Sequence, residues 1–302
     1  MEKEYRIIIY YKYTPVNDPE AFVAWHKALS DQLGLTGRVL IAKEGINGTL
    51  EGTKEDIEEY KRVMHLQDGT PGTFADLSDL WFKESPGTGH AFPRMRIKAR
   101  SEIVTLGLGD EDIDPNEITG THLKPEELKQ WFENGEEFEI IDMRNDYEYK
   151  VGHFRGSRDP GLENFRDLSK ALPSLEPLKE KKVLTVCTYG VRCEKASGYL
   201  KKKGFKNVYQ LEGGIGTYMK AFPGEDFLGS LYVFDGRITE RFTDNYQVVG
   251  KCDKCGSTTE HYENCALPEC HRKMLICEEC AQSPVYCGDT CKLAHESRAL
   301  AK

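Results

Sequence analysis

The sequence predicts a multidomain α/β protein with three structural regions. Its 302 residues exceed the length of a typical single domain. Strand and helix patterns alternate in one order in the first part of the chain and in another order in the middle, and the cysteines gather near the end. We therefore expect domains at residues 1–112, 118–225 and 251–302, with a connector at residues 226–250.

The first region follows a β-α-β-β-α-β order. Gly45, Asn47 and Gly48 adopt positive φ at low cost, so they predict a turn between its second and third strands. Thr53 and Asp56 are typical of a capped helix start. This order predicts a ferredoxin-like (acylphosphatase-like) α+β sandwich. The expected strands are residues 5–13, the two halves of 37–52, and 94–106; the expected helices are residues 18–34 and 53–67.

The middle region has the short apolar runs that are typical of buried parallel strands. They occur in "FEIIDMR" and "KKVLTVCT", and helical patterns lie before the first run and after the second. A third strand pattern, "NVYQLEGGI", ends near paired glycines. This region is expected to form a parallel sheet covered by helices.

The composition restricts the possible partners. A net charge of −9 with 30% charged residues argues against nonspecific DNA binding, although a local RNA-binding face remains compatible with it. The first residues do not resemble a signal peptide, and no apolar run approaches the roughly 18 residues of a membrane span. We expect a cytoplasmic protein that binds neither membrane nor DNA.

A loop suited to stabilising a thiolate follows the second apolar run. It reads Cys187, Thr188, Tyr189, Gly190, Val191, Arg192, Cys193. A short loop that leads into a helix directs backbone N–H groups inward and lowers the pKa of a cysteine. Cys187 and Arg192 are therefore the candidate catalytic residues. The alternative is a buried structural cysteine.

The residues around this loop resemble the rhodanese superfamily. "IIDMRNDYEYKVGHFRGS" matches the signature of that superfamily, and "VYQLEGGIGTY" matches its late strand and glycine pair. The resemblance implies that Cys187 is the active-site cysteine. It also implies that a Cys-x4-Arg loop holds a sulfane sulfur or a bare thiolate, because related phosphatases have a loop one residue longer. We expect a structural ion-pair and hydrogen-bond network from Asp142, Arg144, Glu148 and His153.

The flanking regions narrow the resemblance to one family. "GRVLIAKEGINGTLEG", "GHAFPRMRIKARSEIVTLGL", "YVFDGRI" and "CTYGVRCEKASGYL" resemble the rhodanese-containing tRNA uridine hydroxylases. This resemblance implies oxygen-dependent 5-hydroxylation of the wobble uridine in the tRNA anticodon loop, with molecular oxygen as co-substrate. No flavin or haem motif is evident. Tyr189 replaces a glycine that is usual in that family, and we consider it a stacking face for a base.

A basic segment is the candidate RNA-binding surface. In "RMRIKAR", strand alternation places Arg94, Arg96, Lys98 and Arg100 on one face. Such a ladder is suited to a phosphate backbone. The alternative is the solvated outer face of an amphipathic strand. Further candidates are Lys43, Asn47 and His90, although a plain hairpin explains the first two equally well.

The cysteine-rich tail predicts two structural zinc sites. Its four pairs are Cys252/Cys255, Cys265/Cys270, Cys277/Cys280 and Cys287/Cys291. Eight thiolates make two tetrahedral sites of four cysteines each, and a segment of this length depends on metal to fold. We favour a cross-brace in which the first and third pairs share one ion and the second and fourth pairs share the other. Sequential pairing is the alternative. For His261, His271 and His295 we favour surface or supporting positions over replacement of a cysteine ligand.

Three functions remain after these observations. The first is tRNA wobble-uridine hydroxylation, in which the Cys187 thiolate adds to C6 of the base. The second is a sulfurtransferase that carries sulfur as a Cys187 persulfide. The third is a noncatalytic RNA or protein adaptor. Cys193 either resolves an oxidised Cys187 or packs at the start of the following helix, and we favour packing. The flanking regions favour the hydroxylase.

Overall fold

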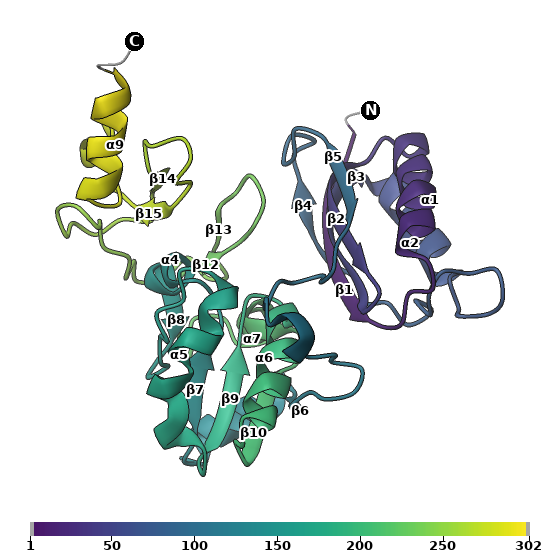
Figure 1. Cartoon of the computed structure of the whole chain (residues 1–302), viewed down its shortest axis with the longest axis horizontal. Coiled ribbons are helices and arrows are strands. Elements are labelled where there is room, and N and C mark those ends of the chain that lie inside the picture. The colour runs from purple at the N-terminus through teal and green to yellow at the C-terminus, as the bar shows by residue number, and fades with distance from the viewer. Residues whose placement is uncertain (1–2, 300–302) are drawn as a thin grey trace. The chain divides into compact units, whose positions relative to one another are not determined.

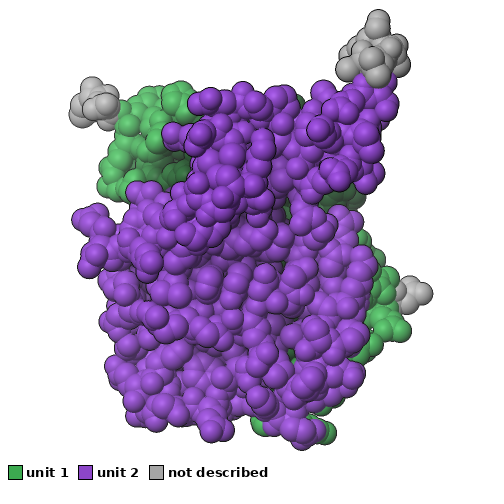
Figure 2. Space-filling model, turned by 90° about the vertical axis from the view of Figure 1, so that its left-hand side faces the viewer, with its two compact units in different colours: residues 1–121, 191–208, 234–238 green, residues 122–190, 209–233, 239–302 purple. Residues whose placement is uncertain are grey.

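The computed structural model describes residues 3–299. The chain divides into two compact units, which are coloured separately in Figure 2. Each unit combines segments that are distant in sequence. The first contains residues 1–121, 191–208 and 234–238, and the second contains residues 122–190, 209–233 and 239–302.

The N-terminal part of the first unit is a five-stranded sheet with the order β4-β1-β3-β2-β5. Two helices cover one face of this sheet (Figure 1). The first four strands pair antiparallel in the order of a ferredoxin-like sandwich, and β5 pairs parallel with β2. The elements are β1 (Tyr5–Tyr13), α1 (Pro19–Gln32), β2 (Thr36–Ala42), β3 (Gly45–Thr53), α2 (Lys54–His65), β4 (Lys83–Gly87) and β5 (Met95–Ala99).

The core of this sandwich lies between the sheet and the two helices. Alternate residues of the strands, such as Ile8 and Leu50, pack against Phe22 of α1 and Ile57 of α2, and all four are fully buried. The helices begin at side-chain caps, as the sequence predicts for α2. Thr53 Oγ1 accepts a hydrogen bond from the Asp56 N–H at 3.3 Å.

The strand that closes the sandwich differs from our expectation. We expected residues 94–106 to close it, but β4 does so, and the expected strand shortens to β5 at the opposite edge. Pro86 and Gly87 make "KESPG" resemble a turn. An edge strand tolerates proline because one side of it needs no ladder hydrogen bond, and Pro86 lies opposite Arg6 on β1.

The middle region contains the expected sheet, with strand order β6-β10-β9-β7 and a parallel β7–β9 pair. Helix α6, which follows the candidate loop, is grouped with the first unit. The elements are η1 (Gly109–Glu111), β6 (Thr121–Leu123), α3 (Pro125–Glu133), β7 (Glu139–Asp142), α4 (Asp146–Val151), β8 (Gly152–Phe154), η2 (Phe165–Asp167), α5 (Leu168–Leu175), η3 (Glu176–Leu178), β9 (Lys182–Val186), α6 (Val191–Lys202), β10 (Asn207–Leu211) and α7 (Gly214–Ala221).

The segment that we interpreted as a connector adds strands to the second unit. One of them pairs antiparallel with β8, and two others form a short hairpin. The cysteine-rich tail follows with one hairpin and two helices. These elements are β11 (Phe227–Gly229), β12 (Leu231–Tyr232), β13 (Thr239–Glu240), β14 (Tyr262–Asn264), β15 (Lys273–Leu275), α8 (Glu278–Ala281) and α9 (Asp289–Ala299).

The tail packs on α4 within the second unit. Tyr262 and Leu275 of its hairpin form a buried cluster with Tyr147 and Val151 of α4. The Tyr262 hydroxyl donates to the Tyr147 carbonyl at 2.7 Å. The cysteine-rich segment therefore supports the helix that carries the Glu148 side chain. Within residues 3–299, no helix is long and apolar enough to cross a membrane.

Candidate active site and metal centres

The candidate loop begins at the end of β9, and Cys187 is fully buried there. The Gly190 N–H donates to Cys187 Sγ at 3.2 Å. Gly190 has a φ of 101°, a conformation that residues with a Cβ rarely adopt. The loop therefore turns a backbone donor toward the sulfur, as the sequence predicts. A donor in this position stabilises the thiolate over the thiol.

The paired glycines before α7 form the support of this loop. The N–H groups of Ile215 and Gly216 donate to the carbonyls of Cys187 and Thr188 at 2.9 and 3.0 Å. Gly214 has a φ of 68°, and a Cβ there would lie 2.6 Å from the Cys187 carbonyl oxygen and from the Tyr189 Cα. Glycine is required because the loop and α7 approach each other more closely than a methyl group allows.

The predicted network lies at the ends of β7 and α4. Arg144 and Asp142 are fully or almost fully buried and form a bidentate pair, with nitrogen–oxygen distances of 2.6–3.1 Å. Arg144 also donates to the Gly152 carbonyl at 2.6 Å. Separating a buried pair of this kind would leave an uncompensated charge, which favours the structural role that the sequence predicts.

Glu148 and His153 make other contacts. Glu148 accepts hydrogen bonds from the Thr188 hydroxyl at 3.3 Å and from the Asn145 N–H at 3.1 Å, so it connects α4 to the loop. His153 stacks on Tyr149 with ring centroids 4.2 Å apart, and its Nδ1 lies 3.0 Å from the Tyr149 carbonyl. Burial lowers the pKa of His153, so the imidazole remains neutral at pH 7.

Tyr189 does not present the stacking face that we expected. Its side chain is 7% exposed, and a Cβ at Gly216 would lie only 2.1 Å from the ring. The hydroxyl donates to Glu240 Oε2 on β13 at 3.0 Å. The aromatic ring fills space between α7 and β13. Tyr189 therefore anchors the loop instead of contacting a base.

The last residues of the loop, from Val191 onward, belong to the first unit. Arg192 is 7% exposed, and its guanidinium carbon lies 5.7 Å from the centroid of the Phe234 ring. Tyr13 on β1 donates its hydroxyl to the Val191 carbonyl at 3.2 Å. Cys193 is fully buried in α6.

A buried lysine on α6 lies among three carboxylates. Lys195 Nζ lies 2.8 Å from Glu44, 2.8 Å from Glu102 and 2.9 Å from Asp112. Burial alone lowers the pKa of Lys195, but the hydrogen bonds to the three acids outweigh it and raise the pKa. Burial raises the pKa of Glu44 despite its contact with Lys195. This cluster attaches α6 to the loop after β2, the loop after β5 and the segment after η1.

The basic ladder has the predicted alternation. Ile97 is buried, Met95 and Ala99 are half-buried, and the four predicted cations are exposed. Arg38 on β2 lies beside Arg96 and extends the ladder onto a second strand. Burial lowers the pKa of Arg38, and repulsion from Arg100 and Arg96 lowers it further. The four predicted cations are Arg94, Arg96, Lys98 and Arg100.

The other candidate RNA-binding residues have different surroundings. Lys43 and His90 are exposed. The backbone around His90 is held by Glu51, whose carboxylate accepts hydrogen bonds from three N–H groups of residues 88–91 at 2.7–2.8 Å. Asn47 donates its side-chain amide to the Ile103 carbonyl at 3.1 Å, so this amide connects β3 to the loop after β5.

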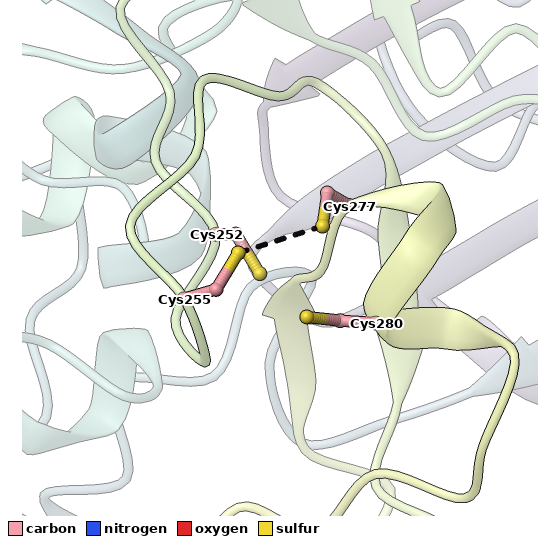
Figure 3. A group of neighbouring side chains, drawn as sticks. All are labelled: Cys252, Cys255, Cys277 and Cys280. Carbon is pink, nitrogen blue, oxygen red and sulfur yellow. Dashed lines mark hydrogen bonds between the residues drawn. The ribbon is translucent and has the colours of Figure 1, made fainter.

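The eight tail cysteines form two groups of four. Within each group the sulfur atoms lie within 4.8 Å of one another. Figure 3 shows the first group, in which the side chains from a loop and from the start of α8 converge. The Cys255 and Cys277 sulfurs are 3.6 Å apart, close to the ~3.8 Å that a tetrahedron of about 2.3 Å zinc–sulfur bonds requires. The groups are Cys252, Cys255, Cys277 and Cys280, and Cys265, Cys270, Cys287 and Cys291.

This grouping is the cross-brace that we favoured over sequential pairing. No histidine belongs to either metal-binding group in the described part of the chain. A hydrogen bond with Ser257 lowers the pKa of Cys255 to about 6, whereas one with Cys255 raises the pKa of Cys280 to about 12. Crowded thiols oppose one another's ionisation, and a divalent cation relieves this repulsion. The donor set and spacing therefore fit zinc.

Sequence reasoning missed the lysine cluster, Arg38 and Glu240. Arg38 had a signal, because it is the charged, outward-facing position of an otherwise apolar strand. The acids of the lysine cluster lie in three separate loops, and Glu240 lies far from Tyr189 in sequence. Their contacts exist only after the chain folds.

Three family models together match most of the chain. They are described as a UPF0176 acylphosphatase like domain at residues 5–103, a rhodanese-like domain at residues 124–221, and a rhodanase C-terminal region at residues 228–292.

Curated relatives match nearly the whole chain. A tRNA uridine(34) hydroxylase of Staphylococcus haemolyticus is 43% identical, and the match covers 99% of this chain and 92% of the relative. Proteins of the same name from Bacillus pumilus and Staphylococcus epidermidis are 45% and 46% identical over 92% and 91% of this chain, and over 85% of each relative. With this identity and coverage, the chain belongs to the tRNA uridine(34) hydroxylase family.

Proposed function

We propose that this protein hydroxylates C5 of the wobble uridine in the anticodon loop of cytoplasmic tRNA and uses molecular oxygen. The observation that carries the proposal is the identity of 43–46% to named tRNA uridine(34) hydroxylases over more than nine-tenths of the chain. The buried Cys187 loop supports it, because this loop has the donor that a reactive thiolate needs. The names of these relatives also favour hydroxylation over sulfur transfer.

Cys187 is the nucleophile in this proposal. C5 of uracil is a poor nucleophile until a group adds at C6. Addition of Cys187 Sγ forms a C–S bond and moves the electrons of the C5–C6 double bond toward C5 and the C4 carbonyl. The resulting enolate attacks an oxygen donor through C5. Loss of the C5 proton and departure of the thiolate then restore the double bond.

The oxygen balance requires a reductant. One atom of molecular oxygen becomes the new hydroxyl group, and the other leaves as water. This stoichiometry consumes two electrons and two protons from a two-electron donor. Cys187 begins and ends the cycle as a thiolate, so the Gly190 N–H that stabilises it is needed in each turnover.

The proposed RNA contact is the ladder of exposed cations on β5 and β2. Arg96 and Lys98 point away from the sandwich core, and Arg38 lies beside them. Such a row neutralises successive phosphates and makes binding dependent on salt. A wobble base lies in a single-stranded loop, so moving it out of its stack costs less than opening a duplex.

Zinc has a structural role in this proposal. The two groups of four cysteines would hold one ion each, and the ions would cross-link a tail whose own buried core is small. A zinc ion bound by four thiolates has no open position for substrate. The tail then supports α4 through Tyr262 and Leu275.

The nucleophile is tested with Cys187→Ser. The variant and the parent protein are expressed in a bacterial strain that lacks its own uridine(34) hydroxylase, and tRNA nucleosides are quantified by mass spectrometry. We expect product to fall by roughly 100-fold or more, since serine is a much weaker nucleophile at neutral pH. Product at the parent level would refute the role of Cys187.

Growth with and without oxygen tests the oxidant in the same strain. We expect the parent protein to form no 5-hydroxyuridine without oxygen. A thiosulfate-to-cyanide assay on purified protein tests sulfur transfer. Substantial turnover there, together with an unaltered nucleoside profile, would replace the hydroxylase assignment with the sulfurtransferase one.

A further inference from the structure

Phe234 is an exposed aromatic residue in a firmly held turn. Its side chain is 52% exposed, whereas its neighbours Val233 and Asp235 are buried. The chain at this point is anchored on both sides of the phenyl ring. Most exposed apolar residues need no explanation. Phe234 differs from them because its neighbours in the chain are buried and hold it in place.

The turn after Phe234 is fixed by a network of its own. Asp235 accepts hydrogen bonds from the Arg237 guanidinium at 2.6 and 2.8 Å and from the Arg237 N–H at 3.0 Å. The Ile238 N–H donates to the Asp235 carbonyl at 3.0 Å. Ile238 has a φ of 64°, which a β-branched residue rarely adopts. Strained backbone of this kind is enriched at functional sites.

Two features of the first unit lie beside this turn. The Arg192 guanidinium carbon is 5.7 Å from the Phe234 ring centroid. A Cβ at Gly236 would lie 3.5 Å from Ala91, in the segment whose N–H groups Glu51 holds. Phe234 is therefore next to the arginine that ends the Cys-x4-Arg loop. The same turn lies against the segment that carries the exposed His90.

We propose that Phe234 is a stacking platform for a nucleobase of the bound RNA, beside the arginine of the candidate loop. This inference rests on the proposed function and identifies a substrate-binding residue for it. An aromatic face with a neighbouring cation is the usual surface on which an unstacked base lies. The buried Tyr189, which occupies the loop itself, does not provide such a face.

The test compares Phe234→Ala with Phe234→Trp and with Trp81→Ala. Trp81 is a matched control, because it is another aromatic residue of the first unit and is 56% exposed. The probe is an anticodon stem-loop RNA with uridine at the wobble position and 2-aminopurine at an adjacent position. Dissociation constants and 2-aminopurine fluorescence are measured for each protein, and thermal melting checks the fold. Product in tRNA is measured as for Cys187→Ser.

We expect Phe234→Ala to bind the RNA about 5- to 100-fold more weakly, to lose 2-aminopurine quenching and to form less product. Phe234→Trp should retain all three properties, and Trp81→Ala should equal the parent protein. An unchanged dissociation constant and unchanged quenching in Phe234→Ala would overturn the inference. Equal losses in Trp81→Ala would overturn it as well.

A fourth variant separates this inference from the proposed function. Arg96→Glu with Lys98→Glu should weaken binding of the same RNA and reduce its salt dependence. If that double variant weakens binding while Phe234→Ala does not, stacking on Phe234 is refuted and the RNA-binding function stands. If the parent protein neither binds the stem-loop nor forms product, the proposed function fails, and the inference fails with it.

Discussion

At the scale of single residues, the candidate loop depends on two glycines. Gly190 places its N–H on Cys187 Sγ through a positive φ. Gly214 permits α7 to donate two backbone hydrogen bonds to the loop carbonyls. Tyr189 then locks the loop through its hydrogen bond to Glu240. The glycines therefore make possible the backbone conformation on which the side chains of this site depend.

Gly214→Ala should damage the loop, and Gly161→Ala should not. Both glycines have a positive φ, 68° and 73°, but a Cβ at Gly161 meets nothing within 4 Å, whereas one at Gly214 meets the Cys187 carbonyl and Tyr189. We expect Gly161→Ala to lose about 1 kcal/mol of unfolding free energy from the positive φ alone. Gly214→Ala should lose more and reduce product by roughly 10-fold or more, because the loop must shift. Urea unfolding and nucleoside analysis measure the two effects, and equal losses would contradict this explanation.

A buried histidine should make stability depend on pH. His26 is fully buried and shares a 2.7 Å hydrogen bond with Tyr60, and burial lowers its pKa from 6.5 to about 3. Between these values the unfolded chain binds a proton that the folded chain excludes. The stabilisation linked to neutral His26 is therefore fully present above about pH 6.5. Below that pH the free energy of unfolding decreases, by up to about 1.4 kcal/mol per pH unit.

His26→Gln provides the control for this prediction. Glutamine keeps a hydrogen-bonding group near Tyr60 but does not titrate. Urea unfolding between about pH 7 and pH 4 should show a shallower loss of stability in the variant than in the parent protein. Parallel curves for the two proteins would contradict the assignment to His26.

At the scale of elements, helix α6 is held by a buried cluster of charges. Lys195 contacts three acids that come from separate loops of the first unit. Arg192 lies one helical turn before Lys195. The cluster therefore fixes the helix that carries Arg192, and Lys195 is a positioning residue.

Lys195→Met should be strongly destabilising. The substitution leaves Glu44, Glu102 and Asp112 without their shared cation, and breaking such a cluster costs about 3–5 kcal/mol. Lys202→Met is the matched control, because Lys202 is an exposed lysine of the same helix. Chemical unfolding measures both variants. A loss below about 1 kcal/mol in Lys195→Met would show that the cluster does not hold α6.

The pH dependence of stability offers a second measurement on the same variant. Burial already raises the pKa of Glu44, and without Lys195 this carboxylate should take up a proton more readily. The destabilisation of Lys195→Met should therefore be smaller at about pH 5 than at about pH 8. A structural defect unrelated to charge would be the same at both values.

At the scale of the whole molecule, the metal sites and the candidate loop are connected through the second unit. The tail packs on α4 through Tyr262 and Leu275, and α4 contacts the loop through Glu148 and Thr188. Lys150 of α4 also pairs with Asp253 of the tail at 3.0 Å. We therefore expect a change at the cysteine groups to affect the loop through α4.

Metal removal should inactivate the protein without unfolding the N-terminal sandwich. Elemental analysis should give about two zinc ions per chain, because each group holds four thiolates. A strong chelator should release both and expose the tail to proteases. Cys280→Ser should lose one ion, whereas His271→Ala should retain both. Retention of both ions in Cys280→Ser would contradict the assigned ligands.

Local patterns were sufficient for several parts of the fold and site. The alternation of "RMRIKAR" predicted which side chains are exposed, because a strand has a strict period of two. The order of strand, loop and helix predicted the turn in which Cys187 is buried. The spacing of the cysteine pairs predicted two groups of four. Each of these features depends on residues that are near one another in sequence.

Other features required long-range contacts. "KESPG" forms the strand that closes the sandwich because β1 offers an open edge, and its own residues favour a turn. Tyr189 is buried because Gly216 and Glu240 provide a space and a partner for it. Within a loop, no local pattern distinguishes a buried tyrosine from an exposed one.

The sequence by itself determined most of the element types, the candidate cysteine and the residues available to bind metal, because periodicity, turn chemistry and ligand spacing act over a few residues. Only the tertiary structure decided the closing strand, the cross-braced grouping of the cysteines, the carboxylates around Lys195 and the exposed position of Phe234. These features depend on which distant segments pack together and exclude water. Only the folded chain brings such segments together.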